Sequence, residues 1–233
     1  MQMTKKSKSA KVDILAVAIE SIKKGKIAEV IDMMDAHPSL IDSEAENGVS
    51  LLMYATYYKQ SDLVYHIAAL RNSFNFFENC ILGHLENAKI QVAKNPSIVN
   101  EFSGDGFTPL IYACFFGQFK LVEYLLENGA EINQQAKNTT TVTPLHSAVS
   151  GNHFQIVRFL LHKKAKVNMR QIHGRMPLHI ASLLGNNNIV EMLIEYGAHV
   201  NVKTEDGRTP MAIALEKGFK ETAEIIESYG GKI

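Results

Sequence analysis

Histidine and cysteine are among the residue types of this sequence that could support acid–base, metal or redox chemistry. The chain has nine histidines and two cysteines among its 233 residues. A catalytic or metal site needs several such side chains at suitable spacing, and a histidine without those partners is a weak signal. The histidines are scattered, and no nucleophile elbow, phosphate loop, HExxH pair or paired-cysteine pattern occurs. The sequence therefore predicts no catalytic residue, no metal site and no cofactor, and we expect a protein that is not an enzyme.

Two of the histidines, His146 and His179, stand in a phrase that recurs, and this gives them a structural explanation. Each lies three residues after a candidate helix-capping position, so we expect the imidazoles to hydrogen-bond the cap and nearby loops. Related phrases follow at steps of 35, 33 and 33 residues, which indicates that the chain stacks one small unit repeatedly. The four copies are Thr108-Pro109-Leu110, Thr143-Pro144-Leu145-His146, Met176-Pro177-Leu178-His179 and Thr209-Pro210-Met211.

Each repeated unit predicts a pair of helices. A threonine followed by proline starts a helix well, because the hydroxyl caps free N–H groups and proline needs no hydrogen-bond acceptor there. The first helix should end near Gly117, and the apolar stripe of Leu121, Val122 and Leu125 indicates a second helix that ends near Gly129. An extended finger then leads to the next unit. Recurrent asparagines that we expect to tie the finger backbones together are Asn133, Asn168 and Asn201.

These recurring phrases resemble the ankyrin repeat, and the match is specific because several positions recur together in register. The resemblance implies an all-α fold: a solenoid of about seven helix-pair units with short β-hairpin fingers. It also implies a non-catalytic protein–protein interaction module that ordinarily binds through a concave groove. Neither helix of a unit can bury its apolar stripe alone, so neighbouring units must share a continuous core.

The resemblance extends over nearly the whole chain, although the first half is more divergent. Gly25 and Pro38 reappear 58 residues later as Gly83 and Pro96, which reveals further units in that half. We expect a repeat domain at residues 12–233, preceded by a basic flexible tail at residues 1–11 whose lysines, Lys5, Lys6, Lys8 and Lys11, keep the chain in solution. The expected units cover about residues 12–46, 47–75, 76–104, 105–137, 138–172, 173–205 and 206–233, and the polar end units should close the stack as a complete solenoid.

Two units depart from the regular length. Only 24 residues separate Lys59 from Gly83, both at the position that ends the first helix. The second unit should therefore lack a full finger, and its outer helix, about Asp62 to Arg71, should run almost directly into the third. The finger at residues 138–141 is longer than its counterparts and rich in threonine. A neutral insertion and a binding loop both explain it.

Composition narrows the partner classes. The 24 basic and 24 acidic residues balance, so no overall field favours nucleic acid or an anionic membrane. No apolar run is long enough for a secretory core or a membrane span, and we expect a cytoplasmic protein. Cys80 and Cys114 occupy the same slot of consecutive units, which stacking would separate by ~8–10 Å, so we expect buried thiols without a disulfide.

Two positions of the inner helix are free to serve function. If the capping residue of each unit is position 1, positions 3, 6, 7 and 10 carry the small or apolar pattern of the core. With ~100° per residue, positions 8 and 9 point to the opposite side, into the concave groove. Along the chain these pairs are Lys23-Lys24, Tyr57-Tyr58, Ile81-Leu82, Phe115-Phe116, Ser150-Gly151, Leu183-Leu184 and Glu216-Lys217.

Four of the five central pairs are apolar or aromatic, and charged pairs flank them. Such a patch marks an interaction site, whose partner we expect to be an unidentified protein presenting an apolar or aromatic segment. Packing of these side chains against one another would also explain the pattern, and so would a bend at the shortened second repeat that buries Tyr58 and Leu82. Two other functions stay open: a homodimer formed through the same groove, and a secreted effector acting on a host protein. Finger-tip residues expected to add polar selectivity are Asp105, Phe107, Thr140, Val142, His173, Arg175, Asp206 and Arg208.

Overall fold

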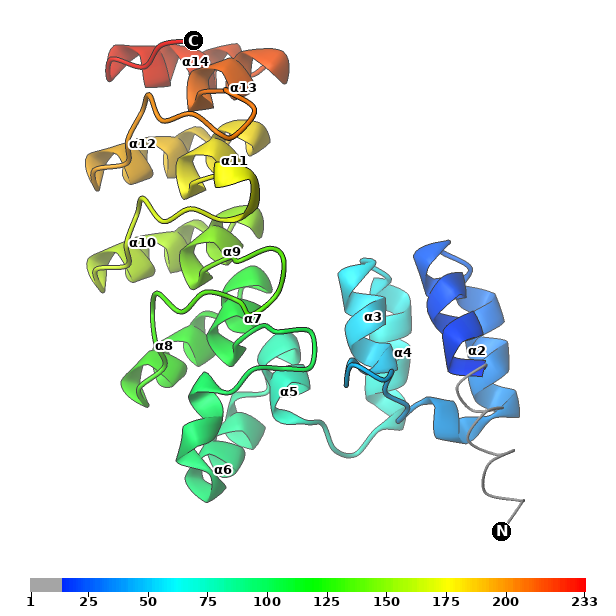
Figure 1. The fold of residues 1–233 in the computed structure, drawn as a ribbon. Helices are drawn as coiled ribbons and strands as arrows, with labels where there is room; N and C mark the ends of the chain where they lie inside the picture. The colour runs from blue at the N-terminus through cyan, green and yellow to red at the C-terminus, as the bar shows by residue number, and fades with distance from the viewer. Residues whose placement is uncertain (1–13) are drawn as a thin grey trace. The chain divides into compact units, whose positions relative to one another are not determined.

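The computed structural model describes residues 14–233, and the regular structure in that range is helical (Figure 1). A helical stretch at residues 14–23 is followed by the helices α2 to α14, which agrees with the predicted solenoid of helix pairs. The helices form two compact bodies, which from here on are called the first and the second unit, whereas the short predicted units are called repeats. The first unit runs to Glu78 and also includes Ser103–Asp105, and the second comprises Asn79–Phe102 and Gly106–Ile233. The predicted tail at residues 1–11 lies outside the described residues.

The first unit contains helical residues 14–23, α2 (Ile27–Ala36), η1 (Pro38–Leu40), α3 (Leu51–Tyr57) and α4 (Ser61–Leu70). These helices bury an apolar core, of which Ile22, Leu52, Leu63 and Ile67 are 0% exposed. α4 ends at Leu70 and α5 (Phe76–Leu82) begins after residues 71–75, so the expected short connection is confirmed.

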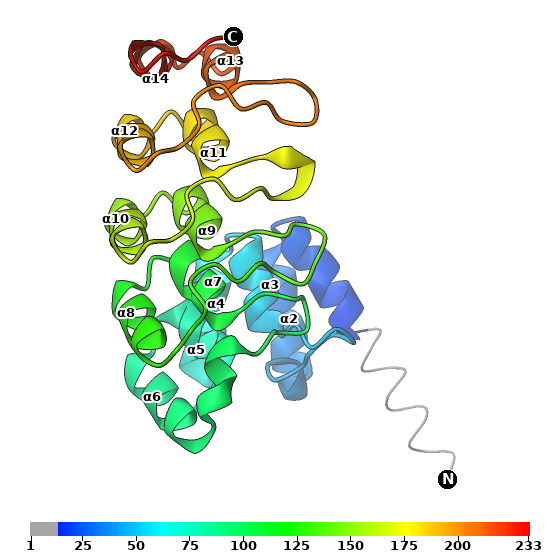
Figure 2. The same ribbon diagram turned by 60° about the vertical axis from the view of Figure 1, so that its left-hand side comes forward.

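The second unit is a regular stack of helices in two rows. α7, α9, α11 and α13 pack on one another in sequence as the inner row, and α8, α10, α12 and α14 form the outer row. In Figure 2 the loops before α9, α11 and α13 project from the inner row, away from the outer one. The elements are α6 (Leu85–Lys94), η2 (Pro96–Asn100), α7 (Pro109–Phe115), α8 (Phe119–Glu127), α9 (Pro144–Ser150), α10 (Phe154–His162), η3 (Ile172–Gly174), α11 (Pro177–Leu184), α12 (Asn187–Glu195), α13 (Pro210–Glu216) and α14 (Lys220–Ser228).

The predicted caps start the inner helices. The hydroxyls of Thr108, Thr143 and Thr209 accept hydrogen bonds from backbone N–H groups three residues later, and a proline follows each. Ser50 caps α3 in the same way. Met176 has no hydroxyl, and there the N–H of Met176 donates to Nδ1 of His179 at 3.0 Å. The ring of His146 makes the same kind of bond to the N–H of Thr143, at 3.3 Å. The N–H of His179, whose hydrogen bond a threonine hydroxyl would accept, instead donates to the carbonyl of Met176 at 3.0 Å.

The recurrent asparagines join consecutive repeats, as predicted. The side chain of Asn168 donates to the carbonyl of Gly197 at 2.8 Å and accepts from the N–H of His199 at 3.0 Å. Asn201 makes the equivalent pair of bonds to Gly230 and Lys232. A further member that the sequence comparison missed is Asn100, which bonds Gly129 and Glu131.

The fingers are irregular loops. No strand is assigned within residues 14–233, and the β-structure there is limited to an isolated antiparallel bridge between Glu44 and Ser50. The β-hairpin part of the prediction is therefore not confirmed. The loops are fixed by turns and by bonds between neighbours, such as that from the N–H of Ile172 to the carbonyl of Thr140 at 3.0 Å. Of the described helices, none is long and apolar enough to cross a membrane.

A buried ion pair holds the end of the first unit, where a full finger is missing. Glu78 is 0% exposed and lies against the guanidinium of Arg71, with N–O distances of 2.6 and 3.0 Å. The same carboxylate accepts from the hydroxyl of Ser50 at 2.6 Å and from the N–H of Asn75 at 2.9 Å. Asp42 lies 3.0 Å from Nε of Arg71. These contacts tie α3, the connection and the start of α5 together.

Candidate functional site

The apolar pairs at the ends of α7 and α11 each present one exposed side chain beside one half-buried side chain. Phe115 closes α7 and is 39% exposed, and the half-buried ring of Phe116 meets it edge-on with centroids 5.0 Å apart. Leu184 closes α11 and is 43% exposed, next to the half-buried Leu183. We call Phe115, Phe116, Leu183 and Leu184 the inner-row surface.

The repeat between these two apolar pairs carries Ser150-Gly151 at the same positions, and the ring of His153 lies against Gly151. His153 precedes α10, and its Nε2 donates to the carbonyl of Phe115 at 2.9 Å. A Cβ added at Gly151 would lie 2.4 Å from that carbonyl oxygen and 2.5 Å from the His153 ring. Position 9 of this repeat must be glycine, because the His153 ring and the Phe115 carbonyl fill the space that a side chain would need. The sequence comparison did not identify His153.

One predicted groove residue is wrong. Ile81 is only 3% exposed, and it follows Asn79 and Cys80, which are also buried. Three consecutive buried residues place packing on more than one side of this helical turn, so Ile81 is not part of a surface. The neighbouring Leu82 is half-buried. The groove positions are counted from the capping residue of each repeat. This repeat has no threonine cap, and position 1 falls on Phe74, so the count was unreliable here.

In the first unit, one predicted groove residue contacts one predicted finger-tip residue. The hydroxyl of Tyr57 donates to Asp105 at 2.5 Å, and the hydroxyl of Ser103 donates to the other carboxylate oxygen at 2.5 Å. Tyr58 is 41% exposed. Its ring is therefore partly open to solvent in this unit.

The predicted finger residues of the second unit occupy different environments. Phe107 packs edge-on against Tyr112, with centroids 5.6 Å apart. Thr140 bonds Asn138 through both its N–H and its hydroxyl, and Val142 is half-buried. The threonine-rich segment is thus an ordered turn.

Charged finger residues lie beside the last two inner helices. Arg208 binds Asp206 at 2.5 Å and Glu216 at 3.1 Å. His173 lies 3.8 Å from Glu205. Arg175 is half-buried.

The buried histidines and cysteines are locked in uncharged forms. Burial lowers the pKa of His146 to about 4 and also lowers the pKa of His179. In His179, Nδ1 accepts from Met176 and Nε2 donates to the carbonyl of Val202 at 3.0 Å, which requires the neutral ring. Burial raises the pKa of both cysteine thiols. These groups are buried in the core or hydrogen-bond the starts of inner helices.

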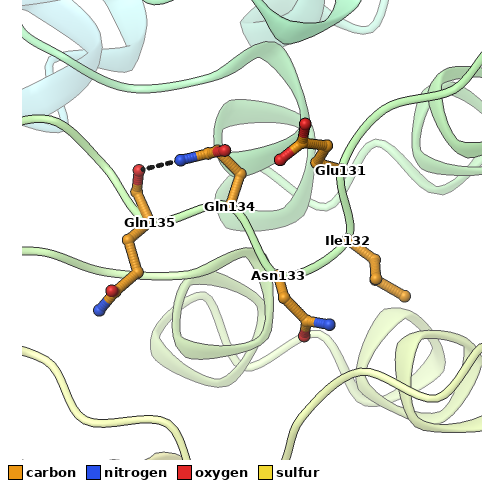
Figure 3. A pocket seen from close by; sticks show the side chains of 5 residues that line it. All are labelled: Glu131, Ile132, Asn133, Gln134 and Gln135. Carbon is orange, nitrogen blue, oxygen red and sulfur yellow. Dashed lines mark hydrogen bonds between the residues drawn. The ribbon is translucent and has the colours of Figure 1, made fainter.

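A solvent-open hollow of about 440 Å³ lies along the loop after α8 (Figure 3). Its lining is Glu131, Ile132, Asn133, Gln134 and Gln135. The Asn133 amide oxygen accepts from the N–H of Lys166, and Gln134 donates to the carbonyl of Gln135 at 3.2 Å. Two of its polar side chains thus hold backbone. In residues 14–233 no cluster of three or more histidine, cysteine or acidic side chains could hold a metal ion.

Comparison with known proteins explains this architecture. Residues 15–171 match the family described as Ankyrin repeats (3 copies), and residues 162–214 match Ankyrin repeats (many copies). Similar proteins include Ankyrin repeat and SAM domain-containing protein 6 of Rattus norvegicus, 32% identical over 100 residues, which are 43% of this chain and 11% of that protein. DNA-binding protein RFXANK of Homo sapiens is 27% identical over 137 residues, 55% of this chain and 53% of the relative.

The chain thus spans about half the length of the human relative and about a tenth of the rat one. Ankyrin repeats generally act as protein–protein interaction modules. The capped inner helices, the asparagine bridges and the sequence match over residues 15–171 all agree, and the chain belongs to the ankyrin-repeat family.

Proposed function

We propose that the second unit binds a protein segment through the inner-row surface of Phe115, Phe116, Leu183 and Leu184. The observation that carries this proposal is the exposure of Phe115 and Leu184 at the ends of two inner helices, 39% and 43%. Exposed aromatic and aliphatic side chains held on a rigid frame are typical anchors of interfaces.

The frame around these side chains is rigid before any partner arrives. His153 fixes the carbonyl end of α7, and Gln118 donates to the carbonyl of Ile81 at 2.8 Å in the same way one repeat earlier. Asparagine bridges repeat along the loops. A preformed surface loses little conformational entropy on binding, so modest apolar contact suffices for affinity.

The spacing of the repeats sets the length of the bound segment. α9 lies between α7 and α11 and packs on both. Two packing steps of 8–10 Å separate the two apolar pairs by roughly 16–20 Å. A helix of about 12 residues, or an extended segment of about 6, would reach across this distance.

The test is partner capture from the native cell extract with Leu184→Asp as bait. We expect the native protein to retain a partner that Leu184→Asp loses, while circular dichroism stays native. Ile90→Asp is a matched control, because Ile90 is 55% exposed on α6 and belongs to neither apolar pair. If Leu184→Asp captured the partner as well as Ile90→Asp does, the inner-row surface would be removed from the proposal. Sedimentation of the native protein tests the homodimer: a monomer at high micromolar concentration excludes it.

A further inference from the structure

Two arginines occupy the same place in consecutive repeats but have different surroundings. Arg175 directly precedes Met176, the N-cap residue of α11. Arg208 directly precedes Thr209, the N-cap residue of α13. Arg208 is held between two carboxylates, Asp206 in its own loop and Glu216 at position 8 of α13. This contact also places a residue of the finger beside position 8 of the inner helix.

The equivalent neighbours of Arg175 carry no negative charge. The residue two positions earlier is His173 instead of aspartate, and position 8 of α11 is Leu183 instead of glutamate. His173 is itself 3.8 Å from Glu205. Arg175 forms no ion pair with any described residue, although its side chain is half-buried.

A second guanidinium, that of Arg170, lies in the same loop region, near the Glu205 carboxylate that faces His173. Arg170 bonds the carbonyls of Gly174 and Lys203 at 3.1 and 3.3 Å, and it too forms no ion pair among residues 14–233. Burial lowers the pKa of His179 most, and the charges of Arg170 and Arg175 lower it further. Both guanidinium groups therefore lie near His179, in the first turn of α11.

We propose that Arg175 receives a carboxylate of the bound protein, in the place that Glu216 fills for Arg208 one repeat later. The inference rests on the proposed function and names its ligand: a segment with an aspartate or glutamate beside apolar anchors. A guanidinium offers a planar fork of donors that matches a carboxylate, and the pair strengthens where water is partly excluded. The apolar anchors contact Leu183 and Leu184, and the acidic residue lies on the finger side of α11.

The test uses a random 16-residue peptide library displayed on phage and selected against the full chain. We expect peptides selected by the native protein to combine apolar residues with aspartate or glutamate. Selection on Arg175→Glu should replace those acids with lysine or arginine. Arg158→Glu is the matched control, since Arg158 is exposed on the outer helix α10, and it should select the same acidic peptides as the native protein.

A binding measurement on one selected peptide completes the test. Arg175→Gln should weaken the acidic peptide about 10-fold and its glutamine-substituted version less than 3-fold, because the lost contact is the ion pair. The role of Arg175 would be overturned if the selected peptides depended on Leu184 but were not enriched in acidic residues. It would also be overturned if Arg175→Glu still selected acidic peptides. Either result would leave the proposed function standing. Failure to select any peptide that Leu184→Asp loses would count against both.

Discussion

The two units of this chain are stabilised in different ways. In the second unit, small contacts recur at equivalent positions: threonine caps, asparagine bridges and polar side chains that bond the preceding inner helix. The first unit has a serine cap and one side-chain bond of this kind, from Gln60 to the carbonyl of Ile22. It also has a buried cluster in which Glu78 binds Arg71, Ser50 and Asn75. Where a full finger is missing, several polar contacts thus meet at one carboxylate. Damage should therefore be severe at a single residue in the first unit and mild at any one bridge in the second.

Glu78→Gln should give the largest effect. The substitution removes the buried carboxylate of a largely buried guanidinium and leaves it only the exposed carboxylate of Asp42, so we expect a loss of ~3–5 kcal/mol in the stability of the first unit. Denaturation with urea, followed by hydrogen exchange, should show the loss in α3 and α4. A loss below about 1 kcal/mol would contradict the assigned importance of this pair.

Acid should destabilise the second unit through His146. Its pKa is about 4 in the folded chain because of burial, and ~6.5 when unfolded. The unfolded state binds the proton first, so the contribution is complete above pH ~6.5, falls as pH decreases and levels off below pH ~4. The loss is about 3 kcal/mol, and the pKa of His179 is shifted in the same direction. A His146→Gln variant should show a flatter pH profile in hydrogen exchange at α9, and an unchanged profile would refute this.

Gly151→Ala tests the close approach between neighbouring repeats. The added methyl group would meet the carbonyl oxygen of Phe115 at 2.4 Å, and we expect a destabilisation of ~1–3 kcal/mol. Ser150→Ala, at the exposed neighbouring position, should be nearly neutral. If thermal denaturation gave equal midpoints for the two variants, His153 would not be held as tightly as its geometry indicates.

Asn168→Ala should give the smallest effect. It removes two hydrogen bonds to the next repeat at a partly exposed site, and we expect a loss of ~1 kcal/mol. Asn201→Ala should behave alike, because the same bonds recur there. A loss as large as that of Glu78→Gln would show that the second unit also depends on single contacts.

Local rules predicted much of the fold. The Thr-Pro phrases gave the starts of α7, α9 and α13, and the recurrent asparagines gave the bonds between loops. Contacts between repeats were harder to predict, because a single sequence does not show which side chains meet across 33 residues or more. Ile81 was misplaced because its repeat has no threonine cap from which the positions could be numbered. The link from His153 to Phe115 and the contrast between Arg175 and Arg208 also depend on such contacts, although the Arg208 and Glu216 pair could have been noticed from its spacing.

Site-specific photocrosslinking in the native cell tests most directly whether the inner-row surface binds a protein. A benzophenone amino acid placed at Phe115 should form a discrete crosslinked product, and the additional change Leu184→Asp should remove it. The same probe at Ile90 should give no such product. Crosslinking at Ile90 but not at Phe115, or a product at Phe115 that persists with Leu184→Asp, would contradict binding through the inner row.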